Sequence, residues 1–585
     1  MALLADLTDL LDFFEGNRTP LGVPRVEMSL TEAALEPEAP SLFAPIAFEP
    51  GTGRFHRLPP EALRALIAAA RAGESREDAD WIAARAAMAA ARSSAPPAAF
   101  AEGDTVLTLG LPTHVPGQMR RLRELRRAHG VALASVFYDA IPLSVPEHCG
   151  RALSAAFAET MLALCLQVDR VVAISASAAE DFRTWQRRLL PGLDIPCGVM
   201  PLDAPLPPLA GAPPPLPPPL DDGAPFVLCV ATIESRKNHL LLLHAWLTLL
   251  RRHGPHAVPR LVLAGRQGYG AEAALRLLAD APELRAGVTW LGGVSDALLQ
   301  RLYRDCLFTV FNSFHEGWGL PVTEALSHGK LVITPDHSSL REAGGAAALY
   351  FTPQSEPELA DLAWSLIRDP ARRAALEAEI PARAPLRGWR AVAEGLVATL
   401  AAPAPSLPAP LARAGHVTGR RIGFERREAP PLPALPAPHD ASHTLVMEGE
   451  GWSAQEEWGV WLTAGAAALR LPAVQGKGMR IFLEVSGPPA GSRTRVRAEP
   501  PEAPPGPWLE IPLGANEHRH VELRGPIGPA GDLVIRFDAS DAPALPGESR
   551  RLALLLRGMM LCADDDHWSV EHYFAGRLAL LPLSA

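Results

Sequence analysis

Short runs of apolar residues alternate with longer amphipathic segments in the middle of the chain. These runs lie at residues 226–232, 260–266, 288–293, 307–313 and 330–334. Each has the length of a buried strand, and the segments between them, such as 239–252, have helical spacing. Asn238 directly precedes that helix and is suited to cap it. The alternation predicts a doubly wound parallel sheet covered by helices.

A weaker version of this alternation occupies the first 200 residues. Its apolar runs lie at 104–112, 131–142 and 169–177, and a helical segment such as 149–168 separates them. Two α/β regions of this kind are expected to face each other across a cleft, and such interdomain clefts commonly bind ligands.

The last 145 residues follow a third pattern, in which short alternating runs are broken by glycine, proline and asparagine. This pattern predicts an antiparallel β-sandwich. Proline-rich segments separate the three regions. The predicted organisation is an N-terminal Rossmann-like domain (1–204), a connector (205–225), a second Rossmann-like domain (226–400) whose final helix can pack back on the first, a linker (401–439) and a β-sandwich (440–585).

Composition narrows the class of protein. The 585 residues carry a net charge of −10, which argues against a general nucleic-acid binder. The six cysteines are scattered without zinc spacing, as expected for a reducing cytoplasmic setting. The N-terminus lacks the basic segment of a signal peptide, and the apolar stretch 239–250 is too short to span a bilayer. We therefore expect no membrane-spanning segment.

The stretch "FNSFHEGWGLPVTEALSHGK" (311–330) carries the clearest chemistry. Gly317 and Gly319 allow a tight turn and a close approach to a ligand, and Pro321 suits the start of a helix. Glu316 then lies on the loop and Glu324 about one turn inside the helix. Both lie at the carboxyl edge of the sheet, where they can accept hydrogen bonds from ligand hydroxyls. The alternative is a helix N-terminus whose acidic residues complement its dipole.

A second candidate site lies in "ATIESRKNHLLLLHAW" (231–246), where Arg236 and Lys237 occupy a strand-to-helix loop. Two cations beside a helix N-terminus form an electropositive site for a diphosphate. Because a departing nucleoside diphosphate gains negative charge, such cations stabilise the transition state more than the ground state. An isolated Arg-Lys pair on a protein surface would carry no such meaning.

Together these two stretches resemble glycosyltransferase family 4, the retaining enzymes with two Rossmann-like domains in the GT-B arrangement. The resemblance rests on the two glutamates of "HEGWGLPVTEAL" and on "RKN", with Ser235 where proline is common. It implies a metal-independent hexosyltransferase that needs no cofactor and takes a nucleoside-diphosphate sugar as donor. Arg236 and Lys237 would hold the diphosphate, Glu324 the ribose and Glu316 the sugar. The remaining motif contacts would come from Gly317, Trp318, Gly319 and Leu320.

Other parts of the sequence resemble the family less specifically. "RTPLGVPRVEMSL" (18–30) is similar to its glycine-rich loop, with Gly22 as the flexible position and an ordinary turn as the alternative. Arg266 and Val294 stand at strand ends that border the nucleotide in similar enzymes. In "FYDAIPL", Tyr138 replaces the usual histidine and cannot act as an ordinary base near neutral pH. Asp139 is a candidate to orient a sugar hydroxyl, or else a turn residue.

Three further features allow two interpretations each. The arginine-rich helix 118–130 (Arg120 to Arg127) can bind anionic lipid headgroups, although a solvated helix packed by its apolar face is favoured. The acidic run at 564–566 is interpreted as a surface turn rather than a metal site. Trp452, Trp458 and Trp461 are expected to be core residues rather than a carbohydrate platform.

The sequence thus predicts a glycosyltransferase that moves a hexose, with mannose as the specific expectation, to a glycan or lipid-linked glycan in bacterial polysaccharide or O-antigen assembly. The competing hypothesis is a non-catalytic carbohydrate-binding protein with a degenerate GT-B scaffold. Tyr138 is the main observation in favour of that alternative.

Overall fold

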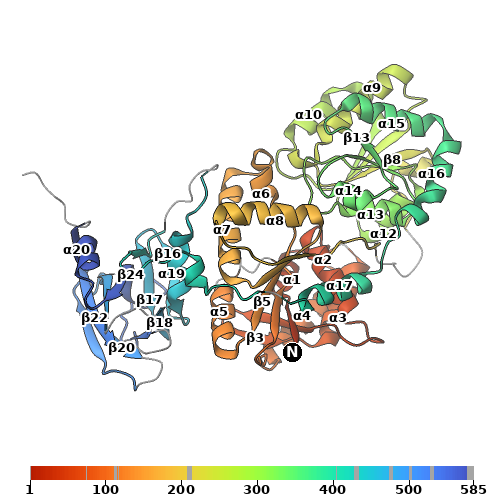
Figure 1. The fold of residues 1–585 in the computed structure, drawn as a ribbon. Coiled ribbons are helices and arrows are strands. Elements are labelled where there is room, and N and C mark those ends of the chain that lie inside the picture. Colours follow the sequence, from red (N-terminus) through yellow and green to blue (C-terminus); the bar gives the residue numbers. More distant parts are fainter. Residues whose placement is uncertain are drawn as a thin grey trace, which may run out of the picture.

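The structure is a computed structural model that describes most of the chain. The described residues are 2–73, 75–110, 115, 117–206, 214–403, 405–426, 434–472, 478–499, 504–526 and 533–575. Residues 207–213 of the predicted connector, and residues 404 and 427–433 of the predicted linker, lie outside these ranges. Figure 1 shows three bodies, with an N-domain (red to orange) between a middle domain (green) and a β-domain (cyan to blue).

The N-domain is built on a seven-stranded sheet of order β3-β2-β1-β4-β5-β6-β7. Only its edge strand β3 pairs antiparallel in the described part of this sheet. The strands are β1 (Leu3–Asp6), β2 (Ala44–Glu49), β3 (Arg54–Arg57), β4 (Thr105–Thr108), β5 (Ala132–Phe137), β6 (Arg170–Ala173) and β7 (Cys197–Val199). The helices are α1 (Thr8–Gly16), α2 (Val23–Ala34), α3 (Pro60–Ala72), α4 (Ala79–Ser94), α5 (Gln118–His129), α6 (Ile141–Ser144), α7 (Arg151–Gln167) and α8 (Ala176–Leu189), with a 3-10 turn η1 (Pro146–His148).

The middle domain has a six-stranded parallel sheet of order β10-β9-β8-β11-β12-β13. Its strands are β8 (Phe226–Val230), β9 (Arg260–Ala264), β10 (Val288–Gly292), β11 (Thr309–Val310), β12 (Val332–Pro335) and β13 (Leu349–Phe351). The order reverses between β8 and β11. Ligands of doubly wound sheets bind at such a reversal, outside the carboxyl ends of the strands. The two loops singled out from the sequence follow these two strands.

Helices cover the middle sheet and extend back to the N-domain. They are α9 (His239–His253), α10 (Glu272–Asp280), α11 (Pro282–Gly287), α12 (Asp296–Asp305), α13 (Leu320–Ser327), α14 (Leu340–Gly344), α15 (Glu356–Arg368), α16 (Pro370–Arg383) and α17 (Trp389–Ala401), with 3-10 turns η2 (Leu220–Asp222) and η3 (Ser235–Lys237). Helix α17 lies against α2 of the N-domain, where Arg390 donates to the carbonyl oxygens of Ala33 and Pro40 at 3.2 and 2.8 Å. The chain therefore crosses between the two Rossmann-like domains more than once.

The β-domain is a sandwich of two antiparallel sheets, as the sequence predicts. One sheet has the order β16-β17-β24-β19-β22, with β14 paired to β24, and the other has the order β15-β18-β23-β20-β21. The strands are β14 (Ile422–Gly423), β15 (Met447–Glu448), β16 (Trp452–Glu456), β17 (Gly459–Thr463), β18 (Ala467–Leu471), β19 (Gly478–Ser486), β20 (Ser492–Glu499), β21 (Leu509–Leu513), β22 (His518–Pro526), β23 (Leu533–Asp538) and β24 (Leu552–Ala563). Helix α20 (His567–Ala575) packs on β24. The sandwich has a hydrophobic core of its own.

Two expectations about this region are wrong. Trp452 is buried, but Trp458 is 59 % exposed because it stands in the turn between β16 and β17 instead of on an inward-facing strand position. The segment 401–439 is more than a linker. Its strand β14 joins the sandwich, and its helix α18 (Pro410–Arg413) inserts Arg413 against α7, where the guanidinium donates to the carbonyl oxygens of Cys165 and Val168.

The arginine-rich helix α5 forms the seam between the N-domain and the β-domain. Arg123 is buried and donates to the carbonyl oxygens of Thr444 and Met447, at 2.5 and 3.0 Å. Arg127 pairs with Glu448, and Arg126 pairs with Asp169 of its own domain. The favoured expectation of a solvated helix is therefore wrong at these arginines, and the same intramolecular bonds take them away from lipid headgroups.

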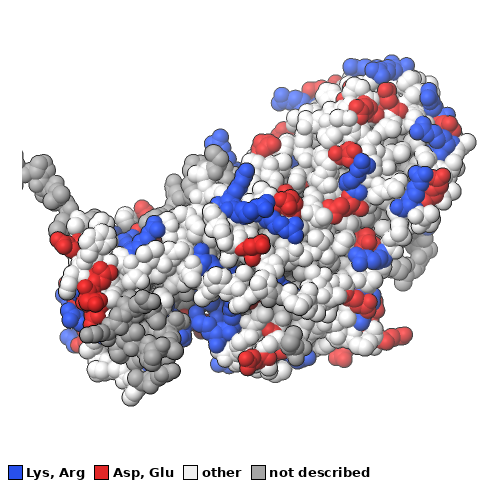
Figure 2. All heavy atoms as spheres, viewed as in Figure 1, with Lys and Arg blue, Asp and Glu red and all other residues white. Residues whose placement is uncertain are grey.

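Basic and acidic side chains are mixed over the face shown in Figure 2, with a small basic group over α8. No helix within the described ranges is both long and apolar enough to cross a membrane. The acidic run at 564–566 lies at the turn between β24 and α20. Among the described residues, no group of three or more His, Cys, Asp or Glu side chains is placed to hold a metal ion.

Candidate active site

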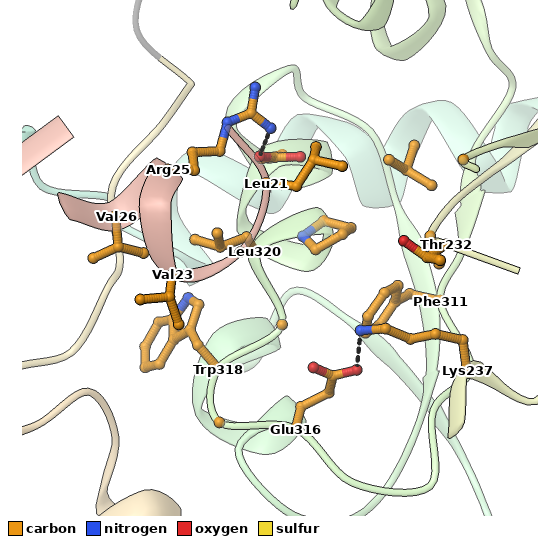
Figure 3. A pocket seen from close by; sticks show the side chains of 18 of the residues that line it. Leu21, Val23, Arg25, Val26, Thr232, Lys237, Phe311, Glu316, Trp318 and Leu320 are labelled. Carbon is orange, nitrogen blue, oxygen red and sulfur yellow. Dashed lines mark hydrogen bonds and ion pairs between the residues drawn. The ribbon is translucent and has the colours of Figure 1, made fainter. Parts of the chain in front are cut away.

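A cavity of about 640 Å³ lies between the N-domain and the middle domain. Its lining includes all thirteen candidate residues from the sequence: Gly22, Tyr138, Asp139, Arg236, Lys237, Arg266, Val294, Glu316, Gly317, Trp318, Gly319, Leu320 and Glu324. Segments of both domains thus converge on one site, as Figure 3 shows for Val23 and Arg25 of α2 opposite Lys237 and Glu316.

The loop after β11 places Glu316 at the centre of this cavity. Gly319 adopts a left-handed conformation with φ of +100° just before α13, which any L side chain would strain. Gly317 lies against the N-domain, because a Cβ at this position would be 2.1 Å from the carbonyl oxygen of Tyr138. Ser175 of the N-domain also donates to the carbonyl oxygen of Gly317 at 2.7 Å. This part of the motif is therefore a point of contact between the two domains.

The loop after β8 brings two cations to Glu316. Arg236 donates to Oε1 of Glu316 at 2.8 Å, and the Lys237 ammonium donates to the same oxygen. Burial acts to raise the pKa of Glu316, but Arg236 and Lys237 outweigh it and bring that pKa to about 2. Glu316 is therefore ionised at neutral pH, and its role is that of a hydrogen-bond acceptor and a fixed negative charge.

Backbone hydrogen bonds hold the two loops together. Phe314 N–H donates to the carbonyl oxygen of Arg236 at 2.9 Å, and the Asn312 side chain donates to the carbonyl oxygen of Asn238 at 3.0 Å. Asn238 caps α9 as predicted, since its side chain accepts from Leu241 N–H at 3.4 Å. The two cations are thus fixed by the same backbone that fixes Glu316.

Glu324 lies one turn inside α13 and is 4 % exposed. Its Oε2 accepts from the Tyr303 hydroxyl at 2.8 Å, and its Oε1 accepts from Arg25 at 3.3 Å. Burial raises the pKa of Glu324, while Arg25 and Tyr303 act in the opposite direction. The two glutamates of one motif therefore differ: strong cationic pairing outweighs burial at Glu316, and burial prevails at Glu324.

The N-domain contributes the remaining wall of the cavity. Gly22 has φ of +58° and immediately precedes α2, which fits its predicted role as the flexible position of a tight loop. The Tyr138 hydroxyl donates to the carbonyl oxygen of Leu109 at 2.7 Å and is therefore committed within its own domain. Asp139 caps a turn by accepting from Ile141 N–H at 3.0 Å, as the turn interpretation predicts. It also borders the cavity, and its action on a sugar hydroxyl stays a prediction.

Sequence reasoning missed the residues that connect the domains around the cavity. Arg25 of α2 pairs with Asp296 of α12 as well as with Glu324. His315 bonds Asp181 of α8 at 2.6 Å, and Glu342 accepts from two N–H groups at the start of α8. The only available signal was for Arg25, which follows Gly22 by three positions within the quoted loop.

Part of the chain matches a known family. The fold has two Rossmann-like domains, and residues 217–383 of the chain match the family of group 1 glycosyl transferases. The serotype-specific mannosyltransferase WbdA of Escherichia coli is 28 % identical over 283 residues, which are 45 % of this chain and 33 % of WbdA. The O-antigen chain mannosyltransferase B of E. coli is 34 % identical over 128 residues, which are 22 % of this chain and 33 % of that protein.

Residues 217–383 of this chain are thus similar to group 1 glycosyl transferases, and parts of the chain are similar to two mannosyltransferases of E. coli. The matched regions span about a third of the length of each of these relatives. Among solved structures, Anabaena Alr3699/HepE in complex with UDP and glucose has a TM-score of 0.44 and 14 % identity, over 69 % of this chain and 100 % of that one.

Proposed function

We propose that the protein is a retaining glycosyltransferase that moves a hexose from a nucleoside-diphosphate sugar to a hydroxyl of a glycan or lipid-linked glycan. The observation that carries the proposal is the contact of Arg236 and Lys237 with Glu316 inside the interdomain cavity. Mannose is the hexose that we propose, because the two E. coli relatives are mannosyltransferases. The proposed process is bacterial polysaccharide or O-antigen assembly.

The two cations are proposed to bind the donor diphosphate. Both sit where the parallel sheet reverses its strand order, next to the first turn of α9. In the structure Glu316 neutralises them, so an entering diphosphate would compete with Glu316 for their hydrogen bonds. Because they supply the positive charge that a departing diphosphate needs, we propose that the step requires no metal ion.

Glu316 is proposed to act on the transferred sugar. An ionised carboxylate accepts hydrogen bonds from sugar hydroxyls and stabilises the positive charge of an oxocarbenium-like state. Trp318 presents an indole N–H that has no hydrogen-bond partner within the described part of the chain, and it lines the same cavity. We propose Gly22, Arg266, Val294 and Glu324 as further donor contacts, with Glu324 on the ribose.

The proposed reaction exchanges one bond at the anomeric carbon for another on the same face of the sugar. The bond from this carbon to the diphosphate oxygen breaks, a bond to the acceptor oxygen forms, and the acceptor proton passes to the departing phosphate. Asp139 borders the cavity and is proposed to orient a sugar hydroxyl. Burial raises the pKa of Asp139, and Arg236 acts to lower it.

We further propose a cytoplasmic location. All six cysteines are free thiols, which fits a reducing compartment. A lipid-linked acceptor would bring the enzyme to the inner face of the membrane. We assign no lipid contact to Arg123, Arg126 or Arg127, because all three bind partners within the chain.

The test is nucleotide release from a panel of sugar nucleotides, including GDP-mannose and UDP-glucose, with and without acceptor glycans. We expect acceptor-dependent release from one donor and its loss in Glu316→Gln and Lys237→Met. The alternative of a non-catalytic carbohydrate-binding protein is favoured by one observation, the Tyr138 hydroxyl that points away to Leu109. Glycan binding without binding or turnover of any donor would establish that alternative and reject the enzyme.

A further inference from the structure

Arg25 joins the two domains at the far end of the cavity from Lys237. It belongs to α2 of the N-domain, and its guanidinium reaches Glu324 of α13 and Asp296 of α12 in the middle domain. All three side chains are at least nine-tenths buried and line the cavity. A buried ion pair with such partners is strongly directional, because each charge is stabilised only in this geometry.

The cluster leaves hydrogen-bonding capacity for a ligand. An ionised carboxylate offers about four acceptor positions, and Glu324 uses two of them in its contacts with Arg25 and Tyr303. The buried Nε of Arg25 has no hydrogen-bond partner in the described part of the chain. A group that carries vicinal hydroxyls, such as a ribose, could therefore bind Glu324 without displacing its two protein donors.

We propose that Arg25 is a positioning residue for the donor, which holds the carboxylate of Glu324 in the orientation that accepts the ribose hydroxyls. This inference rests on the proposed function. Because Arg25 comes from the opposite domain, the ribose site is complete only when the cleft is closed. Donor binding and domain closure must then favour each other, as thermodynamic linkage requires.

The charged and titratable surroundings of Glu324 make the inference testable by pH. Arg25 faces it from α2, and Asp296 and Tyr303 face it from α12. His328 Nδ1 donates to the backbone carbonyl oxygen of Glu324 at 2.8 Å. Arg71 of α3 contacts Asp296 at 3.6 Å but does not contact the Glu324 carboxylate in the described structure. Arg25 is thus the basic side chain in direct contact with the Glu324 carboxylate among the described residues.

The experiment measures the affinity for GDP and for UDP by calorimetry between pH 5 and pH 8. For Arg25→Met we expect a loss of about tenfold at pH 7, the equivalent of about 1.4 kcal/mol. The pH below which nucleotide binding weakens should also rise, because Glu324 loses the cation that lowers its pKa. Arg25→Lys should retain the wild-type pH limit with a smaller loss, of about threefold, because lysine keeps the charge but not the two-pronged geometry.

Arg71→Met is the matched control. Arg71 is as buried as Arg25, and it binds Asp296 and Glu32 but does not contact Glu324. We expect this variant to lose folding stability while keeping the wild-type pH limit of nucleotide binding. A cooperative thermal unfolding transition establishes that each variant is folded. If Arg25→Met does not fold, the nucleotide affinity of Arg25→Lys is used for the test.

Two results would overturn the inference separately from the proposed function. If wild-type protein binds GDP or UDP and Arg25→Met binds it equally well or more tightly at every pH, Arg25 does not position Glu324. If the loss in Arg25→Met is matched by Arg71→Met, the role is only structural. Failure of the wild-type protein to bind any nucleoside diphosphate would instead reject the proposed function itself.

Discussion

The N-domain has two interfaces, and each contains buried arginines with different partners. In the cleft with the middle domain, Arg25 and Arg236 face carboxylates. In the seam with the β-domain, Arg123 and Arg413 donate mainly to backbone carbonyl oxygens. A carboxylate can exchange a cationic partner for a ligand, whereas a carbonyl oxygen in folded backbone has a fixed position. The cleft is therefore suited to binding and the seam to permanent attachment.

The pKa values of these arginines also differ between the cleft and the seam. Burial acts to lower the pKa of Arg25 and Arg236, but Glu324 and Asp296 outweigh it at Arg25, and Glu316 and Glu234 outweigh it at Arg236. In the seam, burial prevails and lowers the pKa of Arg123 to about 9. Burial of an arginine does not by itself mark a candidate site; carboxylate partners that line the cavity distinguish Arg25 and Arg236 from Arg123.

The largest expected effect is in the cleft. Substitution of Lys237 by methionine removes a cation that the departing diphosphate needs, so we expect the rate of sugar transfer to fall by about 100- to 1,000-fold. Steady-state nucleotide release with the best donor and acceptor measures the change. Arg252→Met, at an exposed position on α9 of the same domain, should leave the rate unchanged. Equal losses in both variants would refute the assignment.

The next effect is in the seam. Arg123→Met removes a buried guanidinium that donates to the carbonyl oxygens of Thr444 and Met447, so we expect the free energy of unfolding to fall by about 2–4 kcal/mol. Denaturant unfolding measures this loss, and limited proteolysis should release the β-domain more readily. Nucleotide affinity should not change. Arg121→Met on the same helix, which breaks a half-buried i,i+3 pair with Glu124, should cost about 1 kcal/mol or less.

The two motif glutamates should contribute to stability with opposite signs of pH dependence. The pKa of Glu316 is about 2 in the folded protein and 4.5 in its reference state, so its stabilisation is complete above pH 4.5 and is lost as the pH falls toward 2. The pKa of Glu324 is raised, so ionisation of this group opposes folding as the pH rises above 4.5. In Glu316→Gln, the free energy of unfolding should therefore depend less on pH below pH 4.5 than it does in the wild-type protein.

The size of the Glu316 effect is about 1–3 kcal/mol between pH 4.5 and pH 2, in accordance with 1.36 kcal/mol per pKa unit. Urea unfolding at several pH values measures it. Glu61→Gln, at an exposed position on α3, is the control and should leave the profile as in wild type. A steeper acid loss in Glu316→Gln than in wild type would contradict the assignment.

The smallest effect concerns closure of the cleft. Glu342 of α14 accepts from the N–H groups of Ala176 and Ser177 at 2.7 and 2.8 Å, and so caps α8 from the other domain. Glu342→Gln weakens this exposed cap, and we expect the KM for donor to rise by about two- to fivefold, which corresponds to about 0.5–1 kcal/mol. Ser355→Ala, which removes a cap within the middle domain, should lower stability without changing that KM.

Much of the fold and the centre of the site could be predicted from the sequence. The alternation of apolar runs indicated both parallel sheets, because a buried parallel strand reads as a continuous apolar segment. Glu316 meets Arg236 and Lys237 because their loops leave neighbouring strands at the same edge of one sheet. The sequence pattern is sufficient to predict a contact between two loops where the order of the strands places these loops side by side.

Contacts between domains could not be predicted in this way. Arg25 and Glu324 are 299 positions apart, and no periodicity relates an N-domain helix to a helix of the middle domain. The same limit explains the arginine-rich helix α5, whose partners at Thr444 and Met447 lie more than 300 positions further along the chain. Trp458 was misjudged because alternation shows which face a strand residue takes but not where the strand ends.

Gly317 sets how closely the two domains can approach. A Cβ there would be 2.1 Å from the Tyr138 carbonyl oxygen, where ordinary contact begins at 3.4 Å. A single methyl group would therefore act as a wedge and hold the cleft open by about an ångström. In the proposed reaction, water could then reach the anomeric carbon and compete with the acceptor. The absence of a side chain at Gly317 would thus favour transfer of the donor sugar over its loss by hydrolysis.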